Sequence, residues 1–239
     1  MKKISLLICL CLISSIYSSS EKYLQPFAPY YSQCGQDKYV NENIFNDKKN
    51  GVFIEIGAHD GISYSNSYYF EKFLGWTGIC IEPHPERFAD LKLNRNCVCV
   101  EACVSNVNGE DDFLMIVGAP EQLSGLSNKY DPRHSARIDR ELALDGGSKQ
   151  TIKVNCVTFN DLMEEYNISF IDFLSIDTEG NEFDIIRSID FDKYYIDIIV
   201  VERNFGDQGM NKFLRKKNFV LIKTIGADFI YRNKNSMKE

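Results

Sequence analysis

The sequence of 239 residues lacks the glycine signatures by which many proteins bind phosphates. It contains neither a Gly-x-Gly-x-x-Gly segment nor a Gly-x-x-x-x-Gly-Lys-Ser/Thr segment, the patterns typical of dinucleotide and nucleoside triphosphate sites. It also lacks an extended cluster of basic residues, and its formal net charge is −7. An acidic chain of this kind repels a phosphate backbone, so we expect no nucleic-acid partner.

Paired Cys-x-x-Cys motifs are absent as well, although the sequence contains eight cysteines. Without such pairs a structural zinc site is not expected. Cys80, Cys97, Cys99 and Cys103 lie in apolar segments typical of strands, where a small buried thiol is the simplest interpretation. We expect at most one or two disulfides, in the oxidising compartment that the N-terminal residues indicate.

No apolar run is long enough to cross a bilayer, which takes roughly 20 residues. The N-terminus instead has Lys2 and Lys3, an apolar run over 4–13 and a serine-rich stretch over 14–20. This order is typical of a cleavable signal peptide, so we expect residues 1–20 to be removed and the protein to be secreted or lumenal in the secretory pathway. An uncleaved leader that tethers the protein to a membrane is the alternative; after cleavage no stable membrane span is expected.

The remaining sequence alternates between strand-like and helix-like apolar patterns, as expected for one α/β domain. Expected strands cover 52–56, 78–82, 97–104, 171–176 and 196–201, with further ones at 113–117 and 151–157. Expected helices cover 66–74, 85–93, 160–166, 182–188 and 209–216. This alternation predicts a mostly parallel, doubly wound sheet, closed by an antiparallel hairpin over 219–225 and 228–232.

We place this domain at 51–234, after a lead-in over 21–50 that packs on it and before a tail over 235–239. Within the domain, the segment 118–150 mixes glycine, proline, serine and charged residues without clear periodicity. A segment of that length without a pattern is typical of a lid or a binding loop, so we interpret it as an insert of this kind.

Glycines and acidic residues follow the expected strands at their carboxyl ends, the edge where ligands bind in such sheets. Gly57 and Gly61 after the first strand allow a tight turn and a close approach of the backbone to a ligand. Glu82 ends the second strand, where a carboxylate can accept hydrogen bonds from both hydroxyls of a ribose. Although an ordinary turn would explain the glycines alone, the combination predicts an adenosine-containing ligand.

Acidic residues around the first turn distinguish between adenosine cofactors. Glu55 and Asp60 would repel a pyrophosphate, whereas they suit the ammonium and sulfonium groups of S-adenosylmethionine. S-adenosylmethionine is therefore the expected cofactor. A nicotinamide-dependent oxidoreductase is a further alternative, disfavoured by the missing glycine spacing.

A series of short motifs from about residue 32 to residue 202 resembles the FkbM-type methyltransferase family. In chain order they are Ser32-Gln33-Cys34-Gly35-Gln36-Asp37, Phe53-Ile54-Glu55-Ile56-Gly57-Ala58-His59-Asp60-Gly61, Ser65-Asn66, Glu71-Lys72, Gly75-Trp76-Thr77-Gly78, Ile81-Glu82-Pro83 and Ser175-Ile176-Asp177-Thr178-Glu179-Gly180-Asn181-Glu182. Each motif is modest alone, and their ordered combination is specific.

The resemblance implies a Rossmann-like class I methyltransferase fold, S-adenosylmethionine as methyl donor, and O-methylation of a hydroxyl on a sugar or other small-molecule or glycan acceptor. It implies that the first turn holds the methionine moiety, Glu82 the ribose and residues 102–105 the adenine. Asp177 and Glu179 would lie beside the transferred methyl group. The expected cofactor-binding residues are Glu55, Gly57, Ala58, Asp60, Gly61, Asn66, Glu82, Ser105 and Asp177.

Methyl transfer to an aliphatic hydroxyl requires a general base, because the hydroxyl loses its proton around the transition state. The expected catalytic residues are His59, Asp177 and Glu179, with His59 as the preferred base. His84 is a further candidate, although packing beside adenine explains it equally well. Asp177 and Glu179 together with Glu202 could hold a divalent metal, but solvated carboxylates explain the same pattern, and a metal is not favoured.

A second functional class is compatible with the same residues. S-adenosylmethionine is made in the cytosol, so an enzyme behind a signal peptide depends on its import. A catalytically silent lumenal binding or trafficking protein that retains the methyltransferase fold is therefore the alternative, since a fold alone does not determine a function.

Overall fold

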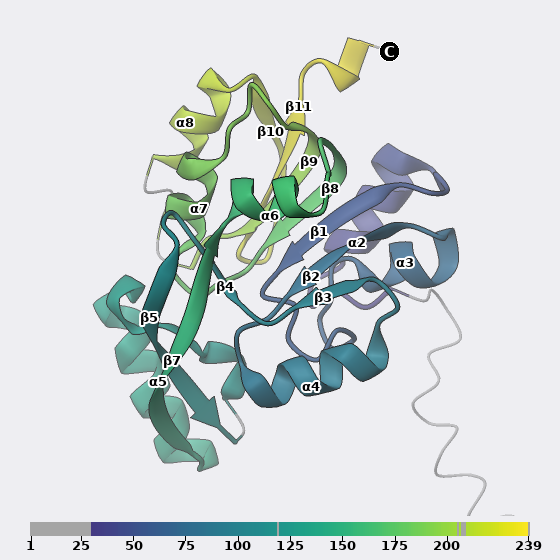
Figure 1. Cartoon of the computed structure of the whole chain (residues 1–239). Coiled ribbons are helices and arrows are strands. Elements are labelled where there is room, and N and C mark those ends of the chain that lie inside the picture. Colours follow the sequence, from purple (N-terminus) through teal and green to yellow (C-terminus); the bar gives the residue numbers. More distant parts are fainter. Residues whose placement is uncertain (1–29, 119, 205, 207–208, 239) are drawn as a thin grey trace, which may run out of the picture. The chain divides into compact units, whose positions relative to one another are not determined.

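The computed structural model describes residues 30–118, 120–204, 206 and 209–238, so the expected signal peptide over 1–20 lies outside the described residues. A seven-stranded sheet in the order β10-β11-β9-β8-β1-β2-β3 forms the centre of the compact unit that begins at Tyr31 (Figure 1). Its strands are β1 (Val52–Ile56), β2 (Thr77–Ile81), β3 (Val98–Val100), β8 (Phe170–Ile176), β9 (Tyr195–Glu202), β10 (Phe219–Ile225) and β11 (Asp228–Asn233).

Neighbouring strands from β3 to β9 pair in parallel, whereas β11 pairs antiparallel with both β9 and β10. The expected α/β class is therefore confirmed, as a Rossmann-like, mostly parallel sheet with a C-terminal antiparallel hairpin. The expected boundaries of β1, β8 and β9 agree with the structure to within one residue at each end.

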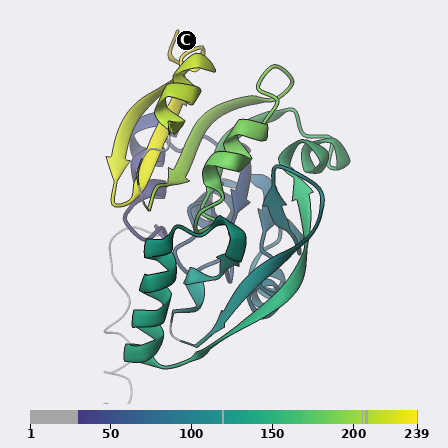
Figure 2. The same cartoon turned by 90° about the vertical axis from the view of Figure 1, so that its left-hand side faces the viewer.

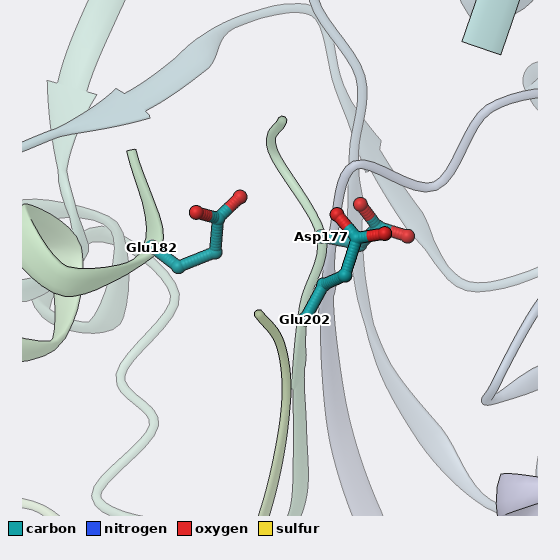
Figure 3. Close-up of side chains that lie close together, drawn as sticks. All are labelled: Asp177, Glu182 and Glu202. Atoms are coloured by element: carbon teal, nitrogen blue, oxygen red, sulfur yellow. The ribbon is translucent and has the colours of Figure 1, made fainter. Parts of the chain in front are cut away.

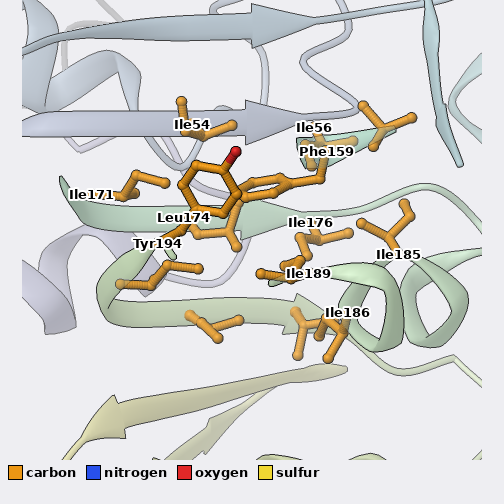
Figure 4. Close-up of a cluster of buried hydrophobic side chains, with 14 of the residues drawn as sticks. Ile54, Ile56, Phe159, Ile171, Leu174, Ile176, Ile185, Ile186, Ile189 and Tyr194 are labelled. Carbon is orange, nitrogen blue, oxygen red and sulfur yellow. The ribbon is translucent and has the colours of Figure 1, made fainter. Parts of the chain in front are cut away.

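Alternate residues of the parallel strands face three helices on one side of the sheet. Successive strand residues point to opposite faces, so Ile54 and Ile56 of β1 share a face. Both are buried, and they belong to one apolar cluster with residues of α6 (Phe159–Glu165), α7 (Glu182–Ser188) and α8 (Met210–Lys216) (Figure 4). This continuous core fixes the carboxyl ends of the strands relative to one another.

The opposite face of β1 carries Phe53 and Glu55. Aromatic rings of the segment containing α3 (Tyr68–Leu74) pack here, with ring centroids of Phe70 and Phe173 5.2 Å apart and those of Phe70 and Trp76 4.7 Å apart. The helix α4 (Pro85–Asn94) begins with proline in its first turn, as its sequence predicts.

The expected third strand over 97–104 is divided in the structure. β3 ends at Val100, and the chain then leaves the main sheet to form β4 (Cys103–Ser105) in a second sheet of order β4-β7-β5-β6. The apolar run is continuous in sequence, so only the tertiary pairing of its two halves reveals the division.

The segment 118–150, which lacks a clear sequence pattern, connects the strands of this second sheet. The sheet comprises β5 (Gly109–Val117), β6 (Gly125–Leu126) and β7 (Ser148–Thr158), with short 3₁₀ turns at Glu121–Leu123 and Ser127–Lys129. A 14-residue helix, α5 (Pro132–Asp145), lies beside it (Figure 2). The described part of the expected insert is therefore a folded subdomain and not an irregular lid loop.

The described part of the lead-in is anchored by its own polar residues. It forms α2 (Gln36–Val40) and a π-helical turn at Asn41–Phe45. The buried carboxylate of Asp37 accepts hydrogen bonds from the backbone N–H groups of Tyr31 and Ser32, and Gln36 donates one to Asp228 of β11. The Ser-Gln-Cys-Gly-Gln-Asp motif therefore joins the lead-in to the C-terminal hairpin, as the expected packing requires.

Two further features concern the described residues only. None of their helices has the length and apolar character needed to cross a membrane. The sulfur atoms of Cys34, Cys80, Cys97, Cys99, Cys103 and Cys156 are unlinked. Cys103 and Cys156 are nevertheless direct neighbours across β4 and β7.

Candidate cofactor and active site

A cavity of about 160 Å³ lies at the carboxyl ends of the central strands and is lined in part by the second sheet. One water molecule requires roughly 10–15 Å³ on this scale, so the cavity takes a ligand of many atoms. Most of the expected site residues line it, namely Glu55, Gly57, Ala58, His59, Asn66, Glu82, Asp177 and Glu179.

The turn after β1 brings the backbone against the end of β8. Gly57 has a φ of +82°, and a Cβ atom at this position would lie 1.8 Å from the carbonyl oxygen of Asp177. The N–H groups of Gly57 and Ala58 both donate to the carbonyl of Ile81, so the turn is also bonded to β2. Only glycine combines this conformation with this close approach, which leaves the cavity floor as bare backbone.

Glu82, at the end of β2, is held by two backbone amides. One carboxylate oxygen accepts the N–H of His59 at 2.8 Å, and the other accepts the N–H of His84 at 2.8 Å. Burial raises the pKa of Glu82, and these two hydrogen bonds oppose that effect. Each oxygen keeps a further lone pair, so the carboxylate is oriented and still able to accept hydrogen bonds from a ligand.

Ala102, Cys103 and Val104 also line the cavity, and they belong to the segment expected beside adenine. Asn181 donates from its side-chain amide to the carbonyl of Val104 at 3.0 Å, and its Oδ1 is buried without a hydrogen-bond partner. Ser105 does not line the cavity, because the chain has already entered the second sheet, where Ser105 pairs with Thr158. The expected adenine site therefore ends at Val104.

Glu55 lines the cavity, but its carboxylate is already bonded to neighbouring protein groups. It accepts hydrogen bonds from the backbone of Asn66 at 2.7 Å and from the hydroxyl of Ser67 at 2.6 Å. It also forms an ion pair with Arg95 at 3.2 Å, whose side chain is fully buried. The structure thus gives Glu55 a structural role, in which it anchors the loop that precedes α3.

Asp60 and Gly61 are not among the cavity-lining residues. Asp60 accepts hydrogen bonds from the N–H groups of Ile62 and Ser63 at 2.8 and 2.7 Å. Burial alone would raise the pKa of Asp60, but the nearby ring of His59, these bonds and one from the Ser63 hydroxyl hold it below its usual range. Asp60 therefore shapes the turn that was expected to bind the ligand directly, and Gly61 leaves room for the Arg95 side chain, 2.7 Å from a would-be Cβ.

Asn66 connects this loop to β8. Its side-chain amide donates to the hydroxyl of Ser175 at 2.9 Å, and its Oδ1 is buried without a hydrogen-bond partner. Asn66 and Asn181 thus both line the cavity, and each has a side-chain oxygen that accepts no hydrogen bond within the protein. Such orphaned acceptors are rare in folded proteins and suit a ligand that carries N–H or O–H groups.

His59 lies between carboxylates. Its ring nitrogens are 3.8 Å from Asp60 and 3.4 Å from Glu121. Burial alone would lower the pKa of His59, but the carboxylates of Asp60, Glu82 and Glu121 outweigh it and raise the pKa. His84, the other candidate, is buried with Nε2 3.2 Å from the carbonyl of Ile116.

Carboxyl groups gather at the ends of β8 and β9. Asp177, Glu179 and Glu202 all line the cavity, and Asp177 and Glu202 are hydrogen-bonded to each other. Figure 3 shows Asp177 and Glu202 side by side, with Glu182 across from them. Asp177 is accessible from the cavity although protein surrounds its carboxyl group. The sequence-based interpretation placed Glu202 only in a possible metal site.

Carboxylate oxygens of Asp177, Glu182 and Glu202 come within 4.8 Å of one another. One oxygen of Glu182, however, already accepts the N–H groups of Thr178 and Gly180 at 2.9 Å and the Thr178 hydroxyl at 3.0 Å. Through these hydrogen bonds Glu182 stabilises the turn after β8. We therefore assign no metal to this group.

The folded insert supplies cavity residues that the sequence pattern did not reveal. Glu121, Gln122 and Ser124 come from the turn after β5, and Arg137 comes from α5. A recognisable signal for α5 exists, because Asp131 caps the helix through a 2.9 Å hydrogen bond from Arg133 and Pro132 follows at the first position. The insert therefore forms a wall of the cavity.

Comparison with known proteins agrees with this architecture. The family model described as the methyltransferase FkbM domain matches residues 55–221. The chain is 26% identical to Methyltransferase 1 of Beauveria bassiana (strain ARSEF 2860), over 69% of this chain and 72% of that protein.

Solved methyltransferase structures are also similar. The FkbM methyltransferase of Methylobacillus flagellatus KT has a TM-score of 0.46 and 11% identity over 78% of this chain and 44% of that one, so the chain spans less than half of its length. A methyltransferase from Pyrococcus furiosus has a TM-score of 0.40 and 11% identity over 94% and 98% of the two chains. Since the family model covers most of the sequence, the chain belongs to the FkbM methyltransferase family.

Proposed function

We propose that the chain is an S-adenosylmethionine-dependent methyltransferase that methylates a hydroxyl of a sugar or other small molecule. The observation that carries this proposal is Glu82, whose carboxylate is oriented by two backbone N–H groups at the cavity wall, beside the bare backbone of Gly57. An oriented carboxylate after the second strand of such a sheet suits the two hydroxyls of a ribose.

The polar atoms around the cavity fit the other parts of the cofactor. Orphaned oxygens of Asn66 and Asn181 can accept hydrogen bonds from its ammonium and adenine amino groups. Ala102 and Val104 offer an apolar surface to the adenine ring. When bound, the cofactor supplies a methyl group on a positively charged sulfur, which the surrounding carboxyl groups stabilise electrostatically.

The acceptor is assigned to the part of the cavity near Asp177 and Glu179. Tyr64 also lines this cavity, and its ring is 60% exposed, which leaves an aromatic face available for a sugar or another flat apolar group. Carboxyl groups that line the same cavity suit an acceptor rich in hydroxyls. The protein then acts mainly by aligning the acceptor oxygen, excluding water and accepting the proton that the hydroxyl loses.

A secretory location is part of the same proposal, because the order of basic, apolar and serine-rich residues at the N-terminus is typical of a signal peptide. The alternative in that compartment is a binding or trafficking protein that retains the cavity without transferring methyl groups. Fractionation of cells that produce the chain with a C-terminal tag tests the location. Its recovery from cytosol with residues 1–20 intact would contradict it.

Calorimetry separates the candidate cofactors. S-adenosylmethionine and S-adenosylhomocysteine are expected to bind and NAD is not. Replacing Glu82 by alanine removes charged hydrogen bonds worth about 1.5–3 kcal/mol each, so the affinity should fall by roughly 10- to 100-fold or more. Glu86→Ala, an exposed carboxylate in α4, is the matched control and should bind normally. Tight binding of NAD alone would overturn the assignment.

A methyl-transfer screen over hydroxylated glycans and small molecules then tests activity. Turnover with S-adenosylmethionine, absent in Glu82→Ala at limiting cofactor, supports the methyltransferase. Tight cofactor binding without turnover on any acceptor class would favour the silent binding protein.

A further inference from the structure

Three carboxyl groups of the cavity, those of Asp177, Glu179 and Glu202, are linked by hydrogen bonds. A buried histidine lies beside one of them. The side-chain nitrogen of Asn204 donates to Glu179 at 2.8 Å and to Glu202 at 2.6 Å. Glu202 is in turn hydrogen-bonded to Asp177. Three mutually close carboxylates cannot all be ionised in a buried place without strong repulsion, so the hydrogen-bond partners decide where protons reside.

The histidine beside Glu179, His134, requires that the carboxyl group of Glu179 be protonated. His134 of α5 is fully buried, and its Nε2 lies 3.1 Å from the carbonyl of Leu123, which can only accept a hydrogen bond. Burial lowers the pKa of His134, so the ring is neutral and its single N–H belongs on Nε2. Nδ1 is then an acceptor, and it lies 3.3 Å from an oxygen of Glu179. A hydrogen bond between these two atoms needs a proton on Glu179.

The same reasoning applies to Glu202 and Asp177. Two carboxyl oxygens form a hydrogen bond only when one of them carries a proton. Glu202 lies deeper and already receives the amide of Asn204, whereas Asp177 is the member accessible from the cavity. The charged groups that act on this cluster include Glu55 of β1, Glu182 of α7 and Asp228 of β11. They also include Arg137 and Glu141 of α5.

We propose that Asp177 is the only ionised member of this trio at neutral pH, that protonated Glu202 donates a hydrogen bond to it, and that Asp177 is the general base for the acceptor hydroxyl. This inference rests on the proposed function. Glu202 acts through Asp177 and is therefore a positioning residue. Burial raises the pKa of Asp177 to about 7, against the lowering effect of the Glu202 hydrogen bond, and raises the pKa of Glu202 to about 12.

The proton and the methyl group move as follows. The acceptor oxygen forms a bond to the methyl carbon while its hydroxyl proton passes to a carboxylate oxygen of Asp177. The bond from that carbon to sulfur breaks, and its electron pair remains on sulfur. The products are a methyl ether, a neutral thioether and a protonated Asp177, which returns its proton to water before the next turnover.

Two replacements of Glu202 distinguish a protonated from an ionised side chain. In Glu202→Gln the amide still donates to Asp177, so the midpoint of the rise in rate with pH should stay within about half a pH unit of 7. If Glu202 were ionised, removing its charge would lower that midpoint by about 1–3 pH units and overturn the proposal. Glu202→Ala removes the donor and should raise the midpoint.

Asp177→Asn tests the base itself. At saturating S-adenosylmethionine, where a change in cofactor affinity does not contribute, the rate of methyl transfer should fall by roughly 10²- to 10⁴-fold. Glu164→Gln and Asp192→Asn replace exposed carboxylates and serve as matched controls. A chelator such as EDTA should leave the rate unchanged, and a strict requirement for added Mg²⁺ or Ca²⁺ would overturn the assignment of Asp177 as base.

A titration of the protein without cofactor provides a readout independent of turnover. With ¹³C-labelled carboxyl groups, NMR should show an aspartate signal that titrates near pH 7 and disappears in Asp177→Asn, separate from that of Asp228, whose pKa burial raises to about 6, while the Glu202 signal stays in its protonated position. If instead Glu202 titrates below pH 6, the inference fails. If the unaltered protein does not bind S-adenosylhomocysteine at all, the proposed function itself is overturned, which is a different outcome.

Discussion

Replacing Arg95 by methionine should destabilise the domain strongly. Its fully buried guanidinium forms ion pairs with Glu55 at 3.2 Å and Glu71 at 2.6 Å and also donates to the hydroxyl of Ser67 at 2.8 Å. Methionine fills a similar volume but leaves two buried carboxylates without a cation. Breaking a buried pair in this way costs about 3–5 kcal/mol, a large part of the 5–15 kcal/mol that stabilises a typical domain.

For a domain of this size such a loss corresponds to a fall in melting temperature of roughly 6–20 °C, measured by circular dichroism and by urea denaturation. Arg187→Met is the matched control, because Arg187 pairs with Asp184 at 2.7 Å but is 53% exposed. It should lose no more than about 1 kcal/mol. If both variants unfold at the same urea concentration, Glu55 is not a structural anchor, and its carboxylate returns to the set of candidate ligand-binding groups.

Two further replacements test the turn and the acidic cluster. Gly57 and Gly35 have φ angles of +82° and +88°, but only at Gly57 would a Cβ meet another atom closely, so Gly35→Ala should cost about 1–2 kcal/mol in urea denaturation and Gly57→Ala clearly more; equal costs would contradict the close contact with Asp177. Asp177→Asn should stabilise the cofactor-free protein increasingly between pH 4 and pH 7. The pKa of Asp177 is raised from 3.8 to about 7, so the aspartate ionises in the unfolded chain from about pH 4 but in the folded protein only near pH 7, and the unaltered protein loses stability as pH rises over this range. A stabilisation independent of pH in thermal melts would contradict that origin.

The parallel sheet is predictable from sequence because its strands are apolar on both faces and end at glycine or acidic residues. β1 and β8 follow this pattern, and their bounds agree closely with the expected ranges. The same pattern fails at 97–104, where one apolar run serves two sheets. Local sequence reports the strand tendency of a segment, whereas its partner strand depends on residues far along the chain.

The sequence pattern does not indicate helix α5, for a related reason. Its buried residues are His134 and Ile138, so it has few of the buried apolar positions by which a helix is normally recognised. The capping signal at Asp131 and Pro132 is present, and it locates the start of the helix even where the apolar pattern does not. Giving end signals equal weight with periodicity would therefore have predicted α5 and the cavity wall that it forms.

Acidic residues at the cavity show where sequence reasoning reaches its limit. Glu55, Glu82 and Asp177 lie in or directly after strands near their carboxyl ends. From their charge alone, all three are predicted to bind the ligand. In the structure Glu55 faces the buried guanidinium of Arg95, Glu82 receives two backbone N–H groups, and Asp177 receives a hydrogen bond from Glu202. A carboxylate neutralised by an arginine holds the fold, one oriented by backbone N–H groups can bind hydroxyls, and one beside other carboxyl groups can take a proton. Because each partner comes from a distant part of the chain, the three roles become distinct only in the folded protein.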